Sequence, residues 1–253
     1  MTPRGSARPV RIPDATVSAA RPDPARGVFT TMLVPHEGPA ENVGAHVARL
    51  QQSVTELYGR ELTSDLEERI TAAAAAKPLQ RLRVLVGEGG LSVEVETSPL
   101  GSDLELEPAV LAPVCLPGGL GAHKWRDRRL LEQLERHLGA LPLIVDLDGE
   151  VLEAATANVL IVEGATVVTP PLDGRLLPGT MRERVLAVAP SAGLTASEEP
   201  ITLEGLAAAD EVLLSSAIRG VGPATLQGAR MPWFEAGARL RHALRPPIPA
   251  EVR

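Results

Sequence analysis

The 253-residue chain is acidic, with a formal net charge of −7 and a pI near 5.4, and its single cysteine excludes an intramolecular disulfide framework. The charge leaves no basic footprint of the kind that nucleic-acid-binding domains carry, and no apolar run approaches the ~18 residues that a membrane-spanning helix needs. The cysteine usage and the lack of an apolar segment in the first residues lead us to expect a cytoplasmic protein without a signal peptide.

Residues 1–26 are rich in proline, arginine and alanine, and we expect a loosely ordered arm there, with a short edge strand near residues 10–12. Residues 27–114 predict a small α/β domain, because β-rich segments alternate with segments of helical periodicity. The expected elements are a strand over 27–34, helices over 42–58 and 64–76, paired strands over 81–86 and 92–97, and a short strand over 110–114.

Residues 115–122 include a glycine-rich run and are interpreted as the link to a larger second domain, residues 123–253. Two dipeptides there, Asp148-Gly149 and Glu163-Gly164, are hairpin signals, so antiparallel strands should meet at them. The whole order of elements predicts an α+β protein of two domains. The elements expected in the second domain are a helix over 129–138, strands over 143–145, 151–154, 158–162 and 166–169, a helix from Met181, a helix after Thr202 and a strand over 211–214.

The segment 151–184 concentrates the residues that could carry chemistry. It begins with an acid, Glu153, and ends in a turn that leads into a helix at Gly179 and Thr180. Thr180 and Glu183 have the spacing of a capping box. A helix that begins behind a glycine offers free N–H groups and a positive dipole end to an anion. The same residues also fit a β-hairpin followed by an ordinary capped helix.

The order and spacing of these residues resemble the signature of the class IV aminotransferases. The matching features are E-x-x-x-x-N from Glu153 to Asn158, an apolar strand ending at Thr169, and L-P-G-T-x-R over 177–182. The pattern departs from the family at Leu160, where an aromatic is common, and at Thr180, where an aliphatic is common. The resemblance covers about residues 27–223. It implies a two-domain fold that clasps pyridoxal 5'-phosphate, usually as a homodimer.

The resemblance also implies roles for single residues. Lys124 matches the Schiff-base lysine, and the only other lysine of the chain, Lys77, should be solvated at the end of an alanine-rich helix. Glu153 matches the acid that faces the pyridine nitrogen, while Asn158 should brace it or the backbone. The phosphate group would be held by Arg49, from the motif H-x-x-R-L, and by Gly179, Thr180, Ser216 and Ala217.

Two further expectations concern the surroundings of these groups. His46, the first residue of the motif H-x-x-R-L, should be structural and bonded to backbone. Arg126 and Arg128, if they lie near Lys124, should disfavour its charged form.

Within the family, Phe29-Thr30-Thr31 resembles the F-T-T of 4-amino-4-deoxychorismate lyase, and Lys124-x-x-Asp127-Arg128 is similar to that branch's K-x-x-N-R. The only tyrosine, Tyr58, lies too early in the chain to match the one that branched-chain aminotransferases place near the cofactor. The resemblance thus implies a lyase that releases pyruvate and 4-aminobenzoate for folate synthesis. Lys124 would move the proton, and Thr31, less readily Thr30, would protonate the leaving group.

Three alternatives stay open beside the lyase. They are an aminotransferase acting on branched-chain or D-amino acids, a degenerate family member without turnover, and a structural α/β module in which the coincidence of residues is accidental. The arginine that would meet substrate carboxylates is also open. The candidates for it are Arg83, Arg126, Arg128 and Arg219.

Overall fold

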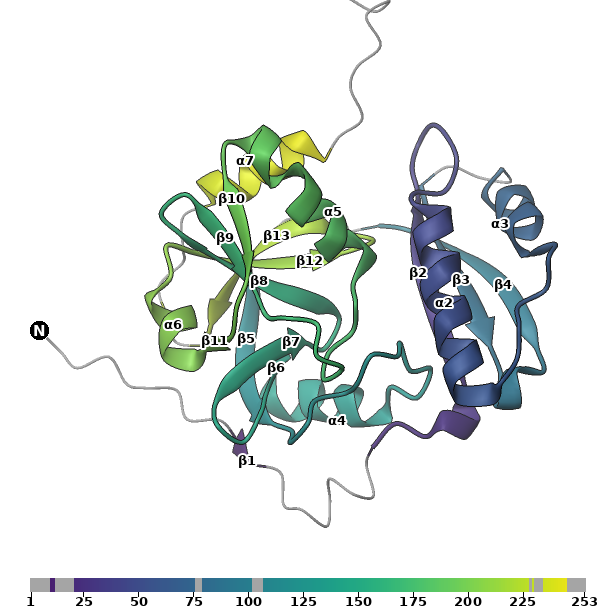
Figure 1. Cartoon of the computed structure of the whole chain (residues 1–253), viewed down its shortest axis with the longest axis horizontal. Helices are drawn as coiled ribbons and strands as arrows, with labels where there is room; N and C mark the ends of the chain where they lie inside the picture. Colours follow the sequence, from purple (N-terminus) through teal and green to yellow (C-terminus); the bar gives the residue numbers. More distant parts are fainter. Residues whose placement is uncertain are drawn as a thin grey trace, which may run out of the picture.

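The computed structural model describes residues 10–11, 21–75, 79–101, 107–227, 229 and 234–244. Within these residues no helix is long and apolar enough to cross a membrane. Lys77 and most of residues 1–20 lie outside the described part. Two structural units are visible in Figure 1, a small sheet with two helices on the right and a larger sheet with its helices on the left.

The small unit is an antiparallel sheet in the order β2-β3-β4, with one face covered by helices. Burial alternates strictly along β2, so Val28, Met32 and Val34 face the helices and Phe29 and Thr31 face away. The buried faces of the sheet and of both helices form one apolar cluster. The elements are β2 (Val28–Val34), α2 (Val43–Tyr58), α3 (Leu66–Ala74), β3 (Gln80–Val86) and β4 (Val93–Pro99), with short 3-10 turns η1 (Pro24–Arg26) and η2 (Glu88–Gly90).

Gly27 fixes the entry into this sheet. Its φ is +92°, and a Cβ at this position would lie 1.9 Å from the carbonyl oxygen of Val86. Only glycine therefore allows β2 to begin so close to the end of β3.

The larger unit is a ten-stranded sheet in which β7 also pairs with β8. The strands β8-β12-β13-β5-β6-β7 consequently close into a ring around an apolar core. Outside the ring, α5 and α7 cover one side and α4 covers another. Its strands are β1 (Val10–Arg11), β5 (Ala109–Cys115), β6 (Leu141–Val145), β7 (Glu150–Ala154), β8 (Ala157–Glu163), β9 (Thr166–Thr169), β10 (Thr195–Glu198), β11 (Ile201–Thr202), β12 (Glu211–Ser216) and β13 (Gly220–Leu226). Its helices are α4 (Arg129–Leu138), α5 (Thr180–Val188), η4 (Ala189–Ala192), α6 (Leu203–Ala208) and α7 (Glu235–Ala243).

A buried carboxylate attaches α7 to the ring. Glu211, at the start of β12, accepts hydrogen bonds from the backbone N–H groups of Glu235, Ala236 and Gly237 at 2.7–2.9 Å. These amides are the unpaired donors of the first helical turn, and a negative charge suits that end of the helix dipole.

The α+β class, with its separate antiparallel sheet and larger mixed sheet, is confirmed. One boundary is wrong. The strand predicted over 110–114 is β5, which pairs with β13 and β6 in the larger sheet and not with the small sheet. The residues of β5 from Leu111 to Cys115 are buried inside that sheet, whereas Val110 is exposed, so the small unit ends with β4. The end of the predicted loose arm is also structured, because Arg21 bonds the carbonyls of Pro117 and Gly119.

Candidate active site

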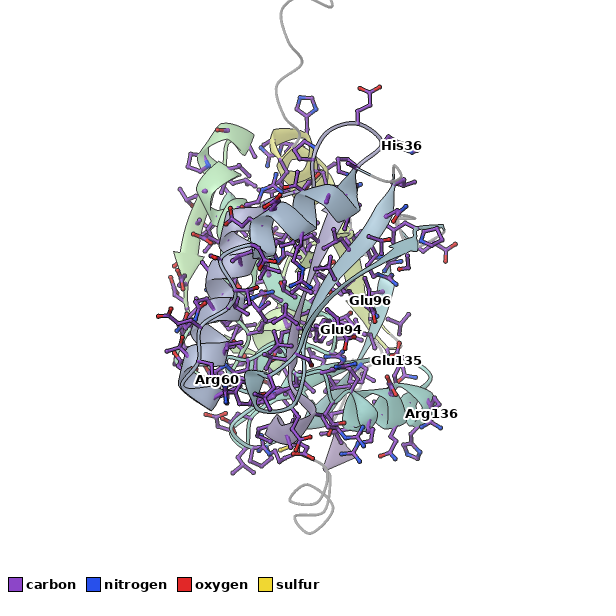
Figure 2. The ribbon with its side chains drawn as sticks, turned by 90° about the vertical axis from the view of Figure 1, so that its right-hand side faces the viewer. His36, Arg60, Glu94, Glu96, Glu135 and Arg136 are labelled. Atoms are coloured by element: carbon purple, nitrogen blue, oxygen red, sulfur yellow. The ribbon has the colours of Figure 1, made fainter. Side chains whose placement is uncertain are left out.

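A cavity of about 880 Å³ is lined by residues of both units, and its size suits a small-molecule ligand. Eight arginines and Lys124 line it against five acidic residues, which favours an anionic ligand. Two of these acids, Glu96 of β4 and Glu135 of α4, are exposed, and Figure 2 shows them on the same side of the molecule. The exposed Arg83 and Arg126 line the cavity as well, so groups of both signs stand at its outer edge, while the carboxyl of Glu153 is buried within it.

Lys124 is positioned by β pairing with the small sheet. Its carbonyl accepts from the N–H of Phe29 at 2.9 Å, Trp125 forms a bridge with Val28, and the N–H of Arg126 bonds the carbonyl of Gly27 at 3.0 Å. The side chain lines the cavity, with Nζ 5.1 Å from the centre of the Phe29 ring. The backbone of the lysine is thus fixed independently of what its side chain binds.

The surroundings of Lys124 favour a neutral amine. The side chain is partly exposed to the cavity, but enough protein surrounds its nitrogen for burial to lower its pKa to about 7. Arg49 and Arg128 lower this pKa further, and Glu153 opposes them. Arg128 lowers the pKa of Lys124 as expected, whereas the other arginines that lower it are Arg49 and Arg83 and not Arg126. Lys124 can therefore act as a nucleophile or a base near neutral pH.

Glu153 lies on β7, opposite Asn158 of β8 in the strand register. Its carboxyl lines the cavity and is 6% exposed. Burial raises its pKa to about 7. A long hydrogen bond of 3.4 Å from the N–H of Leu177 lowers this pKa, as do the charges of Lys124, Arg128 and Arg49, but burial has the larger effect. A carboxyl held in so poorly solvated a position is suited to a cationic partner, such as a protonated ring nitrogen.

Asn158 and Gly179 shape the loop that leads into α5. The amide nitrogen of Asn158 donates to the carbonyl of Leu177 at 2.8 Å, so this side chain braces backbone, one of the two roles expected of it. A Cβ at Gly179 would lie 1.8 Å from Oδ1 of Asn158. Glycine is required there because the loop passes directly against the asparagine, which brings the first amides of α5 to the cavity wall.

The predicted capping box is wrong. Gly179 is the N-cap of α5, and among the described residues no side-chain hydrogen bond caps the helix there. Thr180 is the first helical residue, and its hydroxyl lies 3.1 Å from Nε2 of His46, in the other unit. A buried tertiary partner replaces the local cap, and the amides at the start of α5 receive no side-chain acceptor from the helix itself.

His46 and Arg49 of α2 meet the larger unit at this point. Arg49 donates from one terminal nitrogen to the carbonyl of Pro178 at 3.1 Å and from the other to the hydroxyl of Thr30 at 3.0 Å. His46 was expected to bond backbone, but its ring lies between the hydroxyls of Thr30, at 2.8 Å, and Thr180. Burial, followed by the charges of Arg49, Lys124 and Arg184, lowers its pKa to about 3, so the imidazole is neutral.

Ser215, Ser216 and Ala217 reach the cavity at the end of β12. Within the described chain, Oγ of Ser215 is buried without a hydrogen-bond partner. Ser216 Oγ, by contrast, accepts from the N–H of Arg219 at 3.3 Å. Sequence reasoning named Ser216 and missed Ser215, although both belong to the same polar strand end.

The last residue of the L-P-G-T-x-R motif turns away from the cavity. Arg182 is 2% exposed and bonds the carbonyl of Pro170 at 2.8 Å and the carboxylate of Glu198 at 2.6 Å. It supports α5 from behind, a role that the motif alone did not reveal.

The two threonines of β2 have different positions. Thr31 lines the cavity beside Phe29, whereas Thr30 is fully buried on the helix-covered face, where it meets His46 and Arg49. Tyr58 is distant from this chemistry, since its hydroxyl donates to the carbonyl of Pro24 at 2.7 Å and it does not line the cavity. Of the two threonines, only Thr31 can therefore reach a ligand in the cavity.

The residues present fit a planar ring that carries a phosphate group. The unpartnered Ser215 hydroxyl, the amides of α5 held close by Gly179, and the guanidinium of Arg49 gather donors at one end of the cavity. Lys124 and Glu153 line the same cavity and influence each other's pKa.

Comparison with known proteins assigns this part of the chain to a family. Residues 121–226 match the family model described as amino-transferase class IV. Residues 121–226 form a class IV aminotransferase domain. This class IV domain contains Lys124, Glu153, the loop into α5 and the end of β12, whereas Thr31, His46 and Arg49 come from the small unit that precedes it.

Relatives and solved structures extend this result to the fold. A branched-chain amino acid aminotransferase 2 of Humulus lupulus is 32% identical over 88 residues, which are 34% of this chain and 22% of that relative. The matched segment thus spans less than a quarter of the length of that relative.

Two solved structures match most of the chain. A hypothetical aminotransferase from Mycobacterium tuberculosis, in a form bound to α-ketoglutarate and PMP, has a TM-score of 0.77 at 23% identity, over 87% of this chain and 88% of that one. A Legionella pneumophila protein provisionally named 4-amino-4-deoxychorismate lyase has a TM-score of 0.76 at 18% identity, over 87% and 90%. These two likenesses show that both units together have the fold of class IV structures.

Proposed function

We propose that the protein is a pyridoxal-phosphate-dependent lyase that converts 4-amino-4-deoxychorismate to 4-aminobenzoate and pyruvate. The observation that carries this proposal is the placement of Thr31 in the same cavity as Lys124 and Glu153. One ligand site then has three groups around it. They are the amine of Lys124 as proton acceptor, the carboxyl of Glu153, which suits a pyridine nitrogen, and the hydroxyl of Thr31 from the small sheet.

Pyridoxal phosphate, when bound, would supply an electron sink for the bond that breaks at the substrate carbon. Lys124 would hold the cofactor in the resting protein, and afterwards its amine would take the proton from the ring carbon that carries the substrate nitrogen. A lysine pKa of about 7 lets that amine accept a proton near neutral pH. Glu153 would face the ring nitrogen and keep it protonated.

Loss of this proton allows the carbon–oxygen bond to the enolpyruvyl group to break, and the carbocycle becomes aromatic. The leaving group takes one proton on its methylene carbon to become pyruvate. Thr31 would give that proton; its position in the cavity lining, on the strand that pairs with the Lys124 segment, supports this role. Arg83, the cross-strand partner of Thr31, and Arg128, beside Lys124, are suited to hold the substrate carboxylates.

The alternative is an aminotransferase, which the sequence match to branched-chain aminotransferases favours. An aminotransferase would share the first proton transfer and would then return the proton to the cofactor, so it needs no acid at Thr31. The distant position of Tyr58 supports the lyase, because it leaves no tyrosine in the cavity wall.

The decisive experiment is incubation of the purified protein with chorismate, glutamine and an aminodeoxychorismate synthase, followed by measurement of 4-aminobenzoate and pyruvate. Both products should form in equal amounts, and Lys124→Ala should form neither. Borohydride reduction followed by peptide mapping should place the cofactor on Lys124. Transfer of amino groups from branched-chain or D-amino acids to 2-oxoglutarate, without 4-aminobenzoate, would make the aminotransferase correct. Attachment at Lys77, or no bound cofactor, would remove the basis of both readings.

We also propose a homodimer in the cytoplasm, as the resemblance to the family implies. Light scattering coupled to size-exclusion chromatography should give twice the mass of the chain. A monomeric mass with full activity would refute the dimer.

A further inference from the structure

Four side chains form a continuous series of hydrogen bonds between the two units. It runs from Arg49 to the hydroxyl of Thr30 at 3.0 Å, from that hydroxyl to Nδ1 of His46 at 2.8 Å, and from Nε2 of His46 to the hydroxyl of Thr180 at 3.1 Å. Thr30, His46 and Thr180 are each at most 6% exposed. Water therefore has little access to the series, and every polar atom in it depends on its neighbour.

The chemistry of the groups fixes the direction of donation. A guanidinium only donates, so the oxygen of Thr30 accepts from Arg49. In the described chain the remaining partner of the Thr30 hydroxyl is Nδ1 of His46, to which it donates its hydrogen. A neutral imidazole that accepts at Nδ1 carries its proton on Nε2 and donates it to Thr180. The hydroxyl of Thr180 is then left with its own hydrogen to offer.

That hydrogen is available where the class IV domain presents its anion-binding groups. Thr180 is the first residue of α5 and lines the cavity, as do Gly179 and Ser215. A threonine whose oxygen accepts from the histidine can point its O–H at a ligand oxygen. A threonine that instead donated to the histidine would turn only lone pairs toward an anion, which would repel it.

We propose that His46 is a positioning residue, whose Nε2–H tautomer, set by Arg49 through Thr30, holds the Thr180 hydroxyl as a donor to the ligand's phosphate group. This inference rests on the proposed binding of a phosphorylated cofactor at the start of α5. It assigns to the first residue of the H-x-x-R-L motif a function that spans both units. His46 itself lines the cavity, and in this proposal it acts through the hydroxyl of Thr180 and not by contact with the ligand.

The tautomer can be measured on the unmodified protein. In ¹⁵N-histidine-labelled protein, two-bond proton–nitrogen correlation spectra distinguish Nε2–H, Nδ1–H and imidazolium forms, and the His46→Leu spectrum identifies the signal among the five histidines. The wild type should show Nε2–H at neutral pH. An Nδ1–H tautomer or an imidazolium at His46 would overturn the proposal.

A double-mutant cycle tests the action on phosphate. His46→Leu and Thr180→Val should each weaken pyridoxal phosphate binding by about 10- to 100-fold, the scale of one hydrogen bond to a charged group. The double variant should bind no more weakly than Thr180→Val alone, because the histidine acts through that hydroxyl. His46→Gln, which keeps a donor, should recover part of the affinity. Pyridoxal, which lacks the phosphate, should bind the wild type and all four variants about equally.

Additive losses, or equal losses for pyridoxal and pyridoxal phosphate, would reduce His46 to a packing residue. Inorganic phosphate is the second probe and separates this inference from the proposed function. If wild type binds phosphate through Thr180 but does not bind pyridoxal phosphate, the proposed function fails and the role of His46 stands. If pyridoxal phosphate attaches to Lys124 but the cycle shows no coupling, only the role of His46 fails. If neither probe binds, both are wrong.

Discussion

Replacement of Glu153 by glutamine should stabilise the ligand-free protein and lower the turnover of the cofactor-bound protein. The substitution keeps the shape of the side chain and its contact with the N–H of Leu177 while it removes an ionisable group that is 6% exposed. Burial raises the pKa of Glu153 from 4.5 to about 7. The folded state therefore keeps the proton up to about pH 7, whereas the unfolded chain releases it near pH 4.5.

The sign of the pH dependence follows from this difference. Between pH 4.5 and 7 the folded state binds more protons than the unfolded state, so the free energy of unfolding falls as the pH rises. At about 1.4 kcal/mol per pKa unit, the carboxyl costs the fold about 3 kcal/mol above pH 7. Below pH 4.5 the same carboxyl costs nothing, because it is protonated in both states.

Urea denaturation of ligand-free wild type and Glu153→Gln at pH 5 and pH 8 measures this directly. The variant should gain about 3 kcal/mol relative to wild type at pH 8, and much less at pH 5. Repeating the comparison with Lys124→Met in both proteins removes the contribution of the lysine, which titrates nearby. Turnover should meanwhile fall by about 100-fold or more, because a charged partner of the ring nitrogen is lost. A stability difference that does not depend on pH would show that Glu153 is not desolvated. Near-normal turnover would show that Glu153 is not functional.

Three other changes test separate parts of the site. Thr31→Val should keep cofactor binding and slow pyruvate release by about 100-fold, the scale of one general acid; an unaffected variant would leave Thr31 as an ordinary strand residue. Gly179→Ala should lower cofactor affinity at least about 10-fold, because the added Cβ displaces Asn158. Gly44→Ala in α2, where the backbone is helical and no described atom lies within 4 Å of the added Cβ, serves as the control, and equal effects would contradict the close approach at Gly179. Glu211→Gln should lower the free energy of unfolding, measured by denaturation, by about 2 to 4 kcal/mol. Its control is Glu235→Gln at the same helix end, where the side chain is exposed and the change should be small. Similar values for the two variants would mean that the three hydrogen bonds to backbone amides do not hold α7.

Much of the fold could be predicted because its elements have local signals. The helix over 129–138 and the hairpins at Asp148-Gly149 and Glu163-Gly164 have the periodicity and turn residues that specify them, and they are confirmed. Lys124 could be singled out because the chain has only two lysines. Its low pKa could not be predicted, since it depends on Arg49 and Arg128, which approach only in the folded chain.

The errors share one physical cause, which is competition from partners distant in the sequence. Thr180 and Glu183 have the spacing of a capping box, yet the hydroxyl is taken by His46, 134 residues away. The strand at 109–115 follows the small sheet in sequence, but its residues from Leu111 onward are buried in the larger sheet between β13 and β6. The unpartnered hydroxyl of Ser215 differs from its neighbour Ser216 only through the direction that β12 gives each side chain.

The pairing of the Lys124 segment with β2 determines which groups keep a constant separation. Thr31 and the backbone of Lys124 belong to one hydrogen-bonded sheet edge, whereas Glu153 belongs to the ring of the larger unit. Any rotation of the small unit against the larger one therefore carries the proposed proton acceptor and proton donor together and changes their distance from Glu153. Such a motion would alter the tilt of a bound cofactor between Lys124 and Glu153. The distance between Lys124, which would take the proton from the substrate carbon, and Thr31, which would give one to the leaving group, would stay the same.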